Sequence, residues 1–199
     1  MYIICSDLEG VFVPEIWINV AIKTGIKELS LTTRDISDYD ILMKKRLLIL
    51  KENRLKIDDI KKVIATIDPF EGAVGFLDRL RSHVQVIIVS DTFVQFAGPL
   101  MEKLGRPTLF CHSLDIAKDG SITGYNLRQG NAKQKTVKAL KSLNYKIIAM
   151  GDSYNDINML QEADHGILFN PPENVKTEFP ELPVTCNYTE LEKRINKII

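Results

Sequence analysis

Two carboxylates, Asp7 and Glu9, follow the first apolar run of the sequence and are the first candidates for chemistry. This run, residues 2–5, is rich in β-formers and Gly10 lies just beyond it, so we expect a buried strand that ends near Asp7. Open α/β sheets bind ligands at the carboxyl ends of their strands. There, one carboxylate is placed to attack or to hold a cation and the other to move a proton. The alternative is an ordinary turn, because Asp, Glu and Gly are common after strands.

Two later apolar runs are also followed by polar residues. These polar segments are Ser90-Asp91-Thr92, after residues 84–89, and Gly151-Asp152-Ser153-Tyr154-Asn155-Asp156, after residues 147–150. If the three runs are neighbouring parallel strands, their carboxyl ends share one edge of the sheet and bring Asp7, Ser90 and Asp152 together. This coincidence favours a functional site over a turn at Asp7.

The carboxylates suit a metal ion that prefers oxygen ligands. Asp7 and Asp152 offer two carboxylate oxygens, and Mg²⁺ fits such a sparse shell because it keeps several waters. Asp156 comes one helical turn after Asp152, where it either orients a neighbouring group or is a carboxylate favoured by the helix dipole. We therefore expect a Mg²⁺ site at this edge of the sheet.

Ser90 and Lys133 are the candidates for binding an anionic group. Ser90 precedes a predicted helix. Either its hydroxyl and the free N–H groups of that helix hydrogen-bond the same phosphate, or Ser90 is an ordinary N-cap residue. Lys133 lies near the start of another predicted helix, where the dipole disfavours a cation, so it needs either solvent or an anionic partner. Lys135 is its close competitor. A nucleophilic carboxylate, a carboxylic acid, Mg²⁺, a hydroxyl and a lysine together make a phosphoryl-transfer site with an aspartyl-phosphate intermediate.

Strands and helices alternate along most of the chain, which predicts an α/β fold with a Rossmann-like, doubly wound parallel sheet. We expect this catalytic core in residues 1–13 and 72–199. Residues 14–71 have helical periodicity without a strand pattern and are expected to form an inserted all-helical cap above the site. Further expected elements are a strand at 108–112, a small β-hairpin between Leu114 and Leu127 around Asp119-Gly120, a helix at 131–143, a strand at 166–169 and a C-terminal helix from about Glu190.

The composition of the chain limits the classes of partner that the protein is expected to bind. The 199 residues are 45% hydrophobic, which is enough for one substantial core with a small inserted subdomain. Lys+Arg and Asp+Glu both number 26, so no net charge favours nucleic acid or a membrane surface, and the expected partner is a small molecule. Three cysteines without CxxC spacing argue against disulfides and zinc, so we expect a reducing cytoplasm. The oligomeric state stays open.

The polar segments resemble, in order and spacing, the four motifs of the haloacid dehalogenase superfamily of phosphatases. The matching residues are Asp7-Leu8-Glu9-Gly10-Val11, Ser90-Asp91-Thr92, Lys133 and Gly151-Asp152-Ser153-Tyr154-Asn155-Asp156. Within this superfamily, the helical insertion and the Gly-Asp-Ser-x-Asn-Asp form resemble the phosphoserine phosphatase group. Residues 8–17, 33–46 and 153–159 most closely resemble bifunctional phosphoserine phosphatase/homoserine phosphotransferase enzymes.

The resemblance implies a role for each motif residue. Asp7 would be the nucleophile, and Glu9 the general acid/base whose backbone carbonyl also binds Mg²⁺. Asp152 would complete the protein ligands of the metal, and Asp156 would lie next to these ligands without being one of them. The residues implied for binding the phosphoryl group and the substrate are Ser90, Asp91, Lys133 and Asn155. The implied reaction is hydrolysis of O-phospho-L-serine to L-serine and phosphate, with transfer to homoserine as a second activity.

One departure concerns Glu9, because most of the superfamily carries Asp at this position. The side chain is one methylene longer, which changes how it would activate a water. The homoserine phosphotransferase subgroup shares the Glu.

Glu15 and Arg46, both in the expected cap, are implied for the two ends of an amino-acid substrate. Glu15 matches a residue that pairs with the amino group, and Arg46 matches one that binds the carboxylate. An amino acid needs one anion and one cation outside the phosphate site, and the planar fork of Arg suits a carboxylate. The alternative is that both residues lie on a solvated helix face.

Other functions fit the motifs less well. A phospho-acceptor signalling module of the receiver type also gathers Asp, Ser/Thr, Lys and Mg²⁺ at strand ends, but its acceptor Asp lies on a middle strand and no helical insertion follows its first strand. An inactive binding protein of the same fold would lack a catalytic group, and none is missing. The main alternative is therefore a phosphatase of the same superfamily for another small phosphate monoester.

Overall fold

The central strand of the fold is β1 (Tyr2–Ser6), which is largely apolar because both of its faces are covered. The computed structural model describes residues 1–32, 35–36 and 38–199. Thr33, Arg34 and Ser37, which belong to the expected cap and to the segment 33–46, lie outside the described residues.

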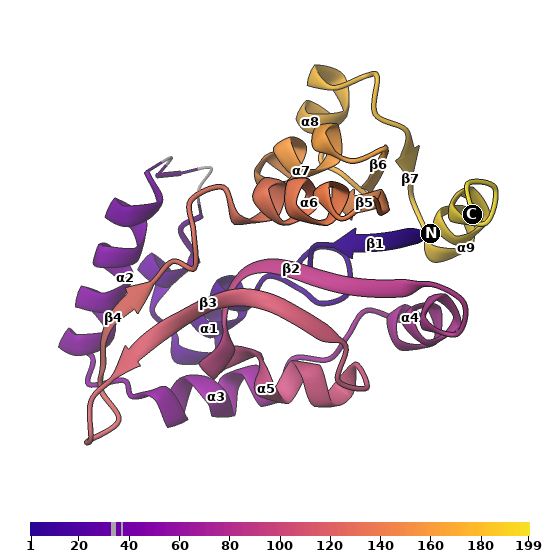
Figure 1. Cartoon of the computed structure of the whole chain (residues 1–199). Coiled ribbons are helices and arrows are strands. Elements are labelled where there is room, and N and C mark those ends of the chain that lie inside the picture. Colours follow the sequence, from indigo (N-terminus) through magenta and orange to yellow (C-terminus); the bar gives the residue numbers. More distant parts are fainter. Residues whose placement is uncertain (33–34, 37) are drawn as a thin grey trace.

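The strands of the described residues form one seven-stranded sheet in the order β4-β3-β2-β1-β5-β6-β7 (Figure 1). Besides β1, these are β2 (Gln85–Phe93), β3 (Thr108–Ile116), β4 (Ile122–Asn126), β5 (Lys146–Gly151), β6 (His165–Phe169) and β7 (Val184–Thr185). All neighbours pair in parallel except β3 and β4, which are antiparallel. The carboxyl ends of β2, β1 and β5 are therefore adjacent at one edge of the sheet, where ligands bind in folds of this kind.

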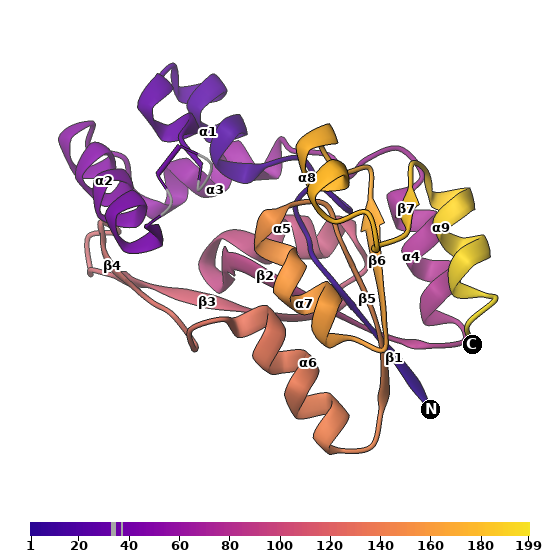
Figure 2. The same cartoon turned by 90° about the horizontal axis from the view of Figure 1, so that it is seen from above.

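Helices cover both faces of the sheet, as the alternation predicted (Figure 2). One face carries α4 (Ala73–Arg81), α5 (Val94–Lys103) and α9 (Tyr188–Ile195); the other carries α6 (Ala132–Ser142), α7 (Ile157–Glu162) and α8 (Glu173–Glu178). Successive residues of a strand point to opposite faces. Accordingly, Ile4 packs in the first core, whereas Ile3 and Cys5 pack in the second. The predicted fold class, a doubly wound α/β sheet, is confirmed.

The helical insertion after β1 lies above the carboxyl edge of the sheet, and both chain termini lie at the opposite end of the molecule (Figures 1 and 2). It contains α1 (Ile16–Thr24), the 3₁₀ helix η1 (Lys27–Ser30), α2 (Tyr39–Glu52) and α3 (Ile57–Ala65). α1 ends where Gly25 takes a left-handed conformation, with φ of 73°. α2 begins where Asp38 accepts hydrogen bonds from the N–H groups of Asp40 and Ile41. Among the described residues no helix is both long and apolar enough to cross a membrane.

β2 runs further than its apolar pattern predicted. It continues through residues 90–92 to Phe93, and its pairing with β3 shifts register between Val89 and Phe93. Helix α5 begins only at Val94, so the prediction that Ser90 directly precedes a helix is wrong. A bulge re-aims side chains, and here it lets polar residues inside a strand face the site instead of the core.

β3 also extends beyond the predicted end at His112 and forms the expected hairpin itself, by pairing with β4. The tip of this hairpin contacts the cap at the start of α3. The N–H of Ile57 donates to the carbonyl of Gly120 at 2.9 Å, and Lys56 Nζ donates to the carbonyl of Asp119 at 2.8 Å. We call this contact the hairpin latch; it comprises residues 56–57 and 119–121, and Lys56 and Ser121 form an antiparallel bridge within it.

Candidate active site

Asp7 lies directly after β1, at the carboxyl edge of the sheet. Its N–H continues the pairing with β5 by donating to the carbonyl of Met150 at 3.0 Å. Its side chain is buried, and Oδ1 accepts a hydrogen bond from the N–H of Leu8 at 2.8 Å. The carboxylate is thus fixed, and its Oδ2 lies 2.9 Å from Lys133 Nζ.

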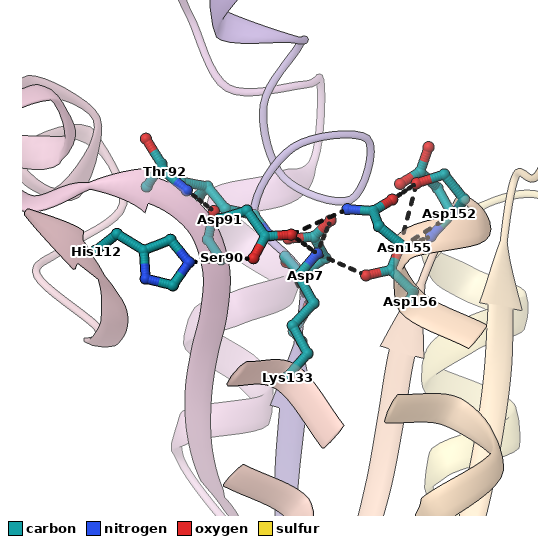
Figure 3. Close-up of polar contacts among 12 residues, drawn as sticks. Asp7, Ser90, Asp91, Thr92, His112, Lys133, Asp152, Asn155 and Asp156 are labelled. Atoms are coloured by element: carbon teal, nitrogen blue, oxygen red, sulfur yellow. Dashed lines mark hydrogen bonds and ion pairs between the residues drawn. The ribbon is translucent and has the colours of Figure 1, made fainter. Parts of the chain in front are cut away.

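Lys133, the second residue of α6, is at the centre of a cluster of carboxylates (Figure 3). Besides Asp7, its Nζ lies 2.8 Å from Asp156 Oδ1 and 3.6 Å from Asp91 Oδ2. Burial acts to lower the pKa of Lys133, but the three carboxylates outweigh it and hold this pKa well above its usual range. The lysine therefore stays charged although it is buried. Its competitor Lys135 is exposed.

Asp156 is fully buried and links Lys133 to the loop after β5. Its Oδ1 accepts a hydrogen bond from Lys133, while its Oδ2 accepts from the N–H groups of Asp152 at 3.0 Å and Ser153 at 3.2 Å. Gly151 makes this arrangement possible, because a Cβ there would lie 2.4 Å from Asp156 Cγ. Asp156 therefore holds both the lysine and the loop that carries Asp152.

Asp7, Asp152 and Asp156 form a cluster that fits a hard cation. One carboxylate oxygen of each lies within 4.8 Å of the other two. Gly10, with φ of 76°, leaves room for Asp152, since a Cβ at Gly10 would lie 2.2 Å from the Cγ of Asp152. Burial, and then the Asp156 carboxylate, hold the pKa of Asp7 well above its usual range, because Lys133 alone does not balance the carboxylates. An all-oxygen donor set with excess negative charge is the kind that Mg²⁺ takes.

Ser90 and Asp91 lie in the bulge of β2 and face the same cluster (Figure 3). Ser90 Oγ accepts a hydrogen bond from the N–H of Thr92 at 3.1 Å, so its own proton remains available to a ligand. Asn155 lies in the 3₁₀ helix η2 (Tyr154–Asp156), and its Nδ2 is 3.4 Å from Asp91 Oδ2. The sequence motifs thus meet as expected, with Asn155 contacting Asp91.

His112 was not among the predicted site residues, yet its Nε2 lies 3.5 Å from Asp91 Oδ1. Burial acts to raise the pKa of Asp91, but Lys133 and the hydrogen bonds from His112 and Asn155 outweigh it and hold this pKa well below its usual range. A signal existed in the sequence: His112 is a polar residue at the predicted end of a strand next to β2. A polar residue at this position is equally typical of an ordinary strand end.

Glu9 reaches from the core to the first helix of the cap. Its Oε2 accepts a hydrogen bond from the N–H of Ile16, the first residue of α1, at 2.7 Å, and its carboxyl group is hydrogen-bonded to Glu15. Burial, and then the nearby Glu15 carboxylate, raise the pKa of Glu9 to about 8. Glu9 is therefore protonated at neutral pH, as a general acid must be. The additional methylene of Glu gives it the reach to contact the cap.

Arg46 lies inside the cap and not on a solvated helix face, since it is only 6% exposed. Its Cζ lies 4.5 Å from the centroid of the Trp17 ring, and its Nη2 donates to the carbonyl of Leu31 at 2.8 Å. Its Nε is buried and has no hydrogen-bond partner within residues 1–32, 35–36 and 38–199. Burial lowers the pKa of Arg46 to about 10. A buried guanidinium with an unused N–H needs an acceptor, and a carboxylate supplies one.

A cavity of about 120 Å³ lies between the cap and the carboxyl edge of the sheet. The predicted residues that line it are Asp7, Glu9, Glu15, Arg46, Ser90, Asp91, Lys133, Asp152 and Asn155. Asp156 lies behind Lys133. The prediction missed the cap residues of the wall, which are Trp17, Thr32, Tyr39 and Leu42. Most of them are aromatic or apolar residues of helices, where the sequence pattern does not separate a cavity wall from ordinary packing.

Comparison with known proteins agrees with this geometry. Residues 15–164 match the family model of the haloacid dehalogenase-like hydrolases. The chain belongs to this family, which confirms the resemblance drawn from its motifs.

Within the family, the chain groups with phosphoserine phosphatases. It is 57% identical over 197 residues to phosphoserine phosphatase ThrH of Pseudomonas aeruginosa, covering 99% of this chain and 96% of the relative. It is 56% identical over 195 residues to a phosphoserine phosphatase of Pseudomonas syringae pv. tomato, covering 98% and 82%. A solved phospho-aspartyl intermediate analogue of phosphoserine phosphatase matches with a TM-score of 0.78 at 26% identity, over 96% of this chain and 97% of that one.

Proposed function

We propose that this chain is a Mg²⁺-dependent phosphoserine phosphatase that works through an aspartyl-phosphate at Asp7. The observation that carries the proposal is a single cavity with groups for both ends of the substrate. Asp7 and Lys133 line it from the core, and Arg46, with its unpaired buried Nε, lines it from the cap. The relatives at 57% and 56% identity are named phosphoserine phosphatases, which supports the substrate and the hydrolysis in this proposal.

In the first half-reaction the Asp7 carboxylate attacks phosphorus, and the bond between phosphorus and the serine oxygen breaks. Glu9, protonated at neutral pH, gives its proton to the departing oxygen, so serine leaves as a neutral alcohol. Lys133 and Ser90 donate hydrogen bonds to the phosphoryl oxygens. Mg²⁺, held by Asp7, Asp152 and the backbone carbonyl of Glu9, would balance the negative charge of the phosphoryl group.

In the second half-reaction a hydroxyl compound attacks the same phosphorus, and the bond to Asp7 breaks. Glu9, now ionised, takes the proton of the attacking hydroxyl. Water yields inorganic phosphate, and an alcohol yields a new phosphate ester. Asp7 recovers its carboxylate and Glu9 recovers its proton, so the cycle closes.

The amino-acid end of the substrate binds in the cap. Arg46 pairs with the carboxylate and Glu15 with the ammonium group, while Asn155 contacts the substrate and Asp91 supports Asn155 and Lys133. This pair of opposite charges favours an amino-acid phosphate over another small monoester, which remains the alternative. We also propose the reducing cytoplasm as the location of the protein, since three cysteines without CxxC spacing suit a reduced protein.

We also propose that homoserine accepts the phosphoryl group. An alcohol anchored by Arg46 and Glu15 reacts at an effective concentration far above its bulk value, so it competes with water. Homoserine differs from serine by one methylene, a difference that a small pocket rejects by only about 1–3 kcal/mol.

The hydrolysis proposal is tested by phosphate release from a panel of phosphorylated metabolites, with Mg²⁺ and with a chelator. Phosphoserine should be the best substrate, and the chelator should remove the activity. Asp7→Asn should keep the fold and abolish turnover, because an amide neither attacks well nor holds Mg²⁺. A better substrate without an amino-acid end would replace phosphoserine, and turnover by Asp7→Asn above a few per cent would overturn the mechanism.

The transfer proposal is tested with enzyme, Mg²⁺, phosphoserine and homoserine together. Phosphohomoserine and free phosphate are measured side by side, and both should form. Glu9→Asp, which shortens the arm, should lower the ratio of phosphohomoserine to phosphate. Absence of phosphohomoserine at saturating homoserine would refute the transfer, and an unchanged ratio in the variant would refute the role of the longer side chain.

A further inference from the structure

His112 is buried in β3, only 5% of it is exposed, and it is not among the residues that line the active-site cavity. Its Nδ1 accepts a hydrogen bond from the backbone N–H of Arg128 at 3.1 Å. A backbone N–H can only donate, so this contact leaves Nδ1 without a proton and puts the ring proton on Nε2. The imidazole therefore offers one donor in a fixed direction.

That donor points at Asp91, whose Oδ1 lies 3.5 Å from Nε2 (Figure 3). The other oxygen of Asp91 faces Asn155 Nδ2 at 3.4 Å and Lys133 Nζ at 3.6 Å. Asp91 thus receives donors from β3, η2 and α6, which are separate elements. The mechanism assigns a task to Lys133 and Asn155 but none to His112.

Asp91 is a negative charge beside a site for a phosphoryl group, where an unrestrained carboxylate would repel the substrate. Lys133 does not compensate for it alone, because Asp7 and Asp156 lie closer to the lysine, at 2.9 and 2.8 Å. A carboxylate that moved toward Lys133 would also compete with Asp7 for it. At the observed distance of 3.6 Å, Asp91 leaves the closer contacts of Lys133 to Asp7 and Asp156.

We propose that His112 is a positioning residue, which holds Asp91 by one oxygen and thereby fixes where the other oxygen meets Lys133 and Asn155. This inference rests on the proposed function, because its effect on turnover is read through phosphoserine hydrolysis. Since Lys133 stabilises charge on the phosphoryl group, displacement of Asp91 lowers kcat more than it raises KM.

Two substitutions separate the two nitrogens of the ring. In His112→Gln the amide nitrogen takes the place of Nε2 and still donates to Asp91. In His112→Asn the shorter amide keeps an acceptor for the N–H of Arg128 and loses the donor to Asp91. His83→Asn, at an exposed histidine, is the matched control.

His112→Asn should lower kcat roughly tenfold, as misplacement of a group next to the reacting atoms does, and His112→Gln should recover most of this loss. Combined with Asp91→Asn, His112→Asn should cost nothing further, because the histidine acts through that carboxylate. Equal kcat in His112→Asn and the unmodified enzyme, or additive losses in the double variant, would overturn the inference. Melting temperatures identify any variant that fails to fold.

A measurement without turnover separates this inference from the proposed function. In protein with ¹⁵N-labelled histidine, the ring signals of His112 should show a proton on Nε2, and Asp91→Asn should shift the Nε2 signal. A proton on Nδ1, or no shift, would contradict the inference even in an active enzyme. If phosphoserine is not hydrolysed at all, the proposed function fails while the spectrum still tests the contact.

Discussion

In the proposed reaction, recognition of the amino-acid substrate depends most on Arg46. Its guanidinium is buried against Trp17, and its Nε has no partner within the described part of the chain. Arg46→Ala should therefore lower kcat/KM for phosphoserine, by an amount that corresponds to about 2–4 kcal/mol of transition-state stabilisation, since a desolvated carboxylate would be left unpaired. Steady-state kinetics on the purified variant measure this loss.

Phosphoethanolamine, which lacks the carboxylate, is the control substrate and should respond little to Arg46→Ala. Lys45→Ala removes a neighbouring but exposed cation and is the control variant. Equal losses for the two substrates would mean that Arg46 acts on the phosphate or on the fold.

Glu9 makes stability depend on pH in a direction that can be stated in advance. Its pKa is raised from the ordinary value of 4.5 to about 8, first by burial and then by Glu15. A raised pKa contributes stability that is complete below 4.5 and is lost as pH rises to about 8. Glu9→Gln resembles the protonated acid. Its melting temperature should therefore equal that of the unmodified protein at about pH 4 and exceed it at about pH 9.

The comparison is made with a chelator present, because a bound cation would change the charge balance at Glu9. Melting temperatures across this pH range give the difference directly. A difference that stays constant with pH would show that Glu9 does not titrate between these values.

Among the site residues, the sequence predicted those that follow directly after a strand. Asp7 and Asp152 follow apolar strands, so their meeting at one edge follows from the parallel sheet. Arg46 differs: nothing in the pattern of α2 separates a buried Arg from an exposed one, and only the family resemblance pointed to it. The place of His112 at a predicted strand end was a weak signal, since its contact with Asp91 on another strand is not visible in local sequence.

The loop after β1 depends on Gly10 for two separate reasons. Its φ of 76° disfavours any side chain, and a Cβ would lie 2.2 Å from Asp152 Cγ. Gly25 shares only the first reason, since its φ is 73° and no atom lies within 4 Å of an added Cβ. A comparison of the two glycines therefore separates the effect of backbone strain from the effect of displacing Asp152, a proposed metal ligand.

Gly10→Ala and Gly25→Ala should both lower the melting temperature, because both strain the backbone. Only Gly10→Ala should raise the Mg²⁺ concentration for half-maximal activity, by roughly tenfold, since it moves Asp152. Titration of activity with Mg²⁺ in the two variants tests this. An equal Mg²⁺ requirement in Gly10→Ala and Gly25→Ala would remove Asp152 from the proposed metal site.

The elements that the sequence predicted are those with strong periodicity, and those it missed have little. β7 has two residues, and α8 has six residues that follow Pro171 and Pro172. The ends of β2 and β3 were also missed, because polarity indicated a loop where tertiary pairing keeps the strand. Serine and aspartate in the bulge of β2 are exceptions to strand propensity that the site requires.

The hairpin latch connects the core to the cap away from the active site. The latch includes a backbone hydrogen bond from Ile57 to Gly120, which side-chain truncation does not remove. Ile57 is the first residue of α3, where proline is tolerated, and Lys56 already has the extended backbone that a following proline requires, with φ of −105° and ψ of 169°.

Ile57→Pro should therefore remove the donor while α3 still forms. Amide hydrogen exchange in residues 117–122 should become faster than in Ile57→Val, which also loses buried apolar volume but keeps the N–H. Equal exchange in the two variants would show that the latch is not held by this hydrogen bond.

In the proposed reaction, the latch would also influence which acceptor takes the phosphoryl group. Water would need only a small opening to reach a phosphorylated Asp7, whereas a second amino acid would enter only after the cap has opened and serine has left. Transfer to homoserine would therefore depend on whether the cap opens before water hydrolyses the phosphorylated enzyme. A looser latch would let the cap open sooner, so Ile57→Pro should yield more phosphohomoserine per phosphate than Ile57→Val. The hairpin at the edge of the sheet would then determine how much of the phosphorylated enzyme reacts with water and how much reacts with homoserine.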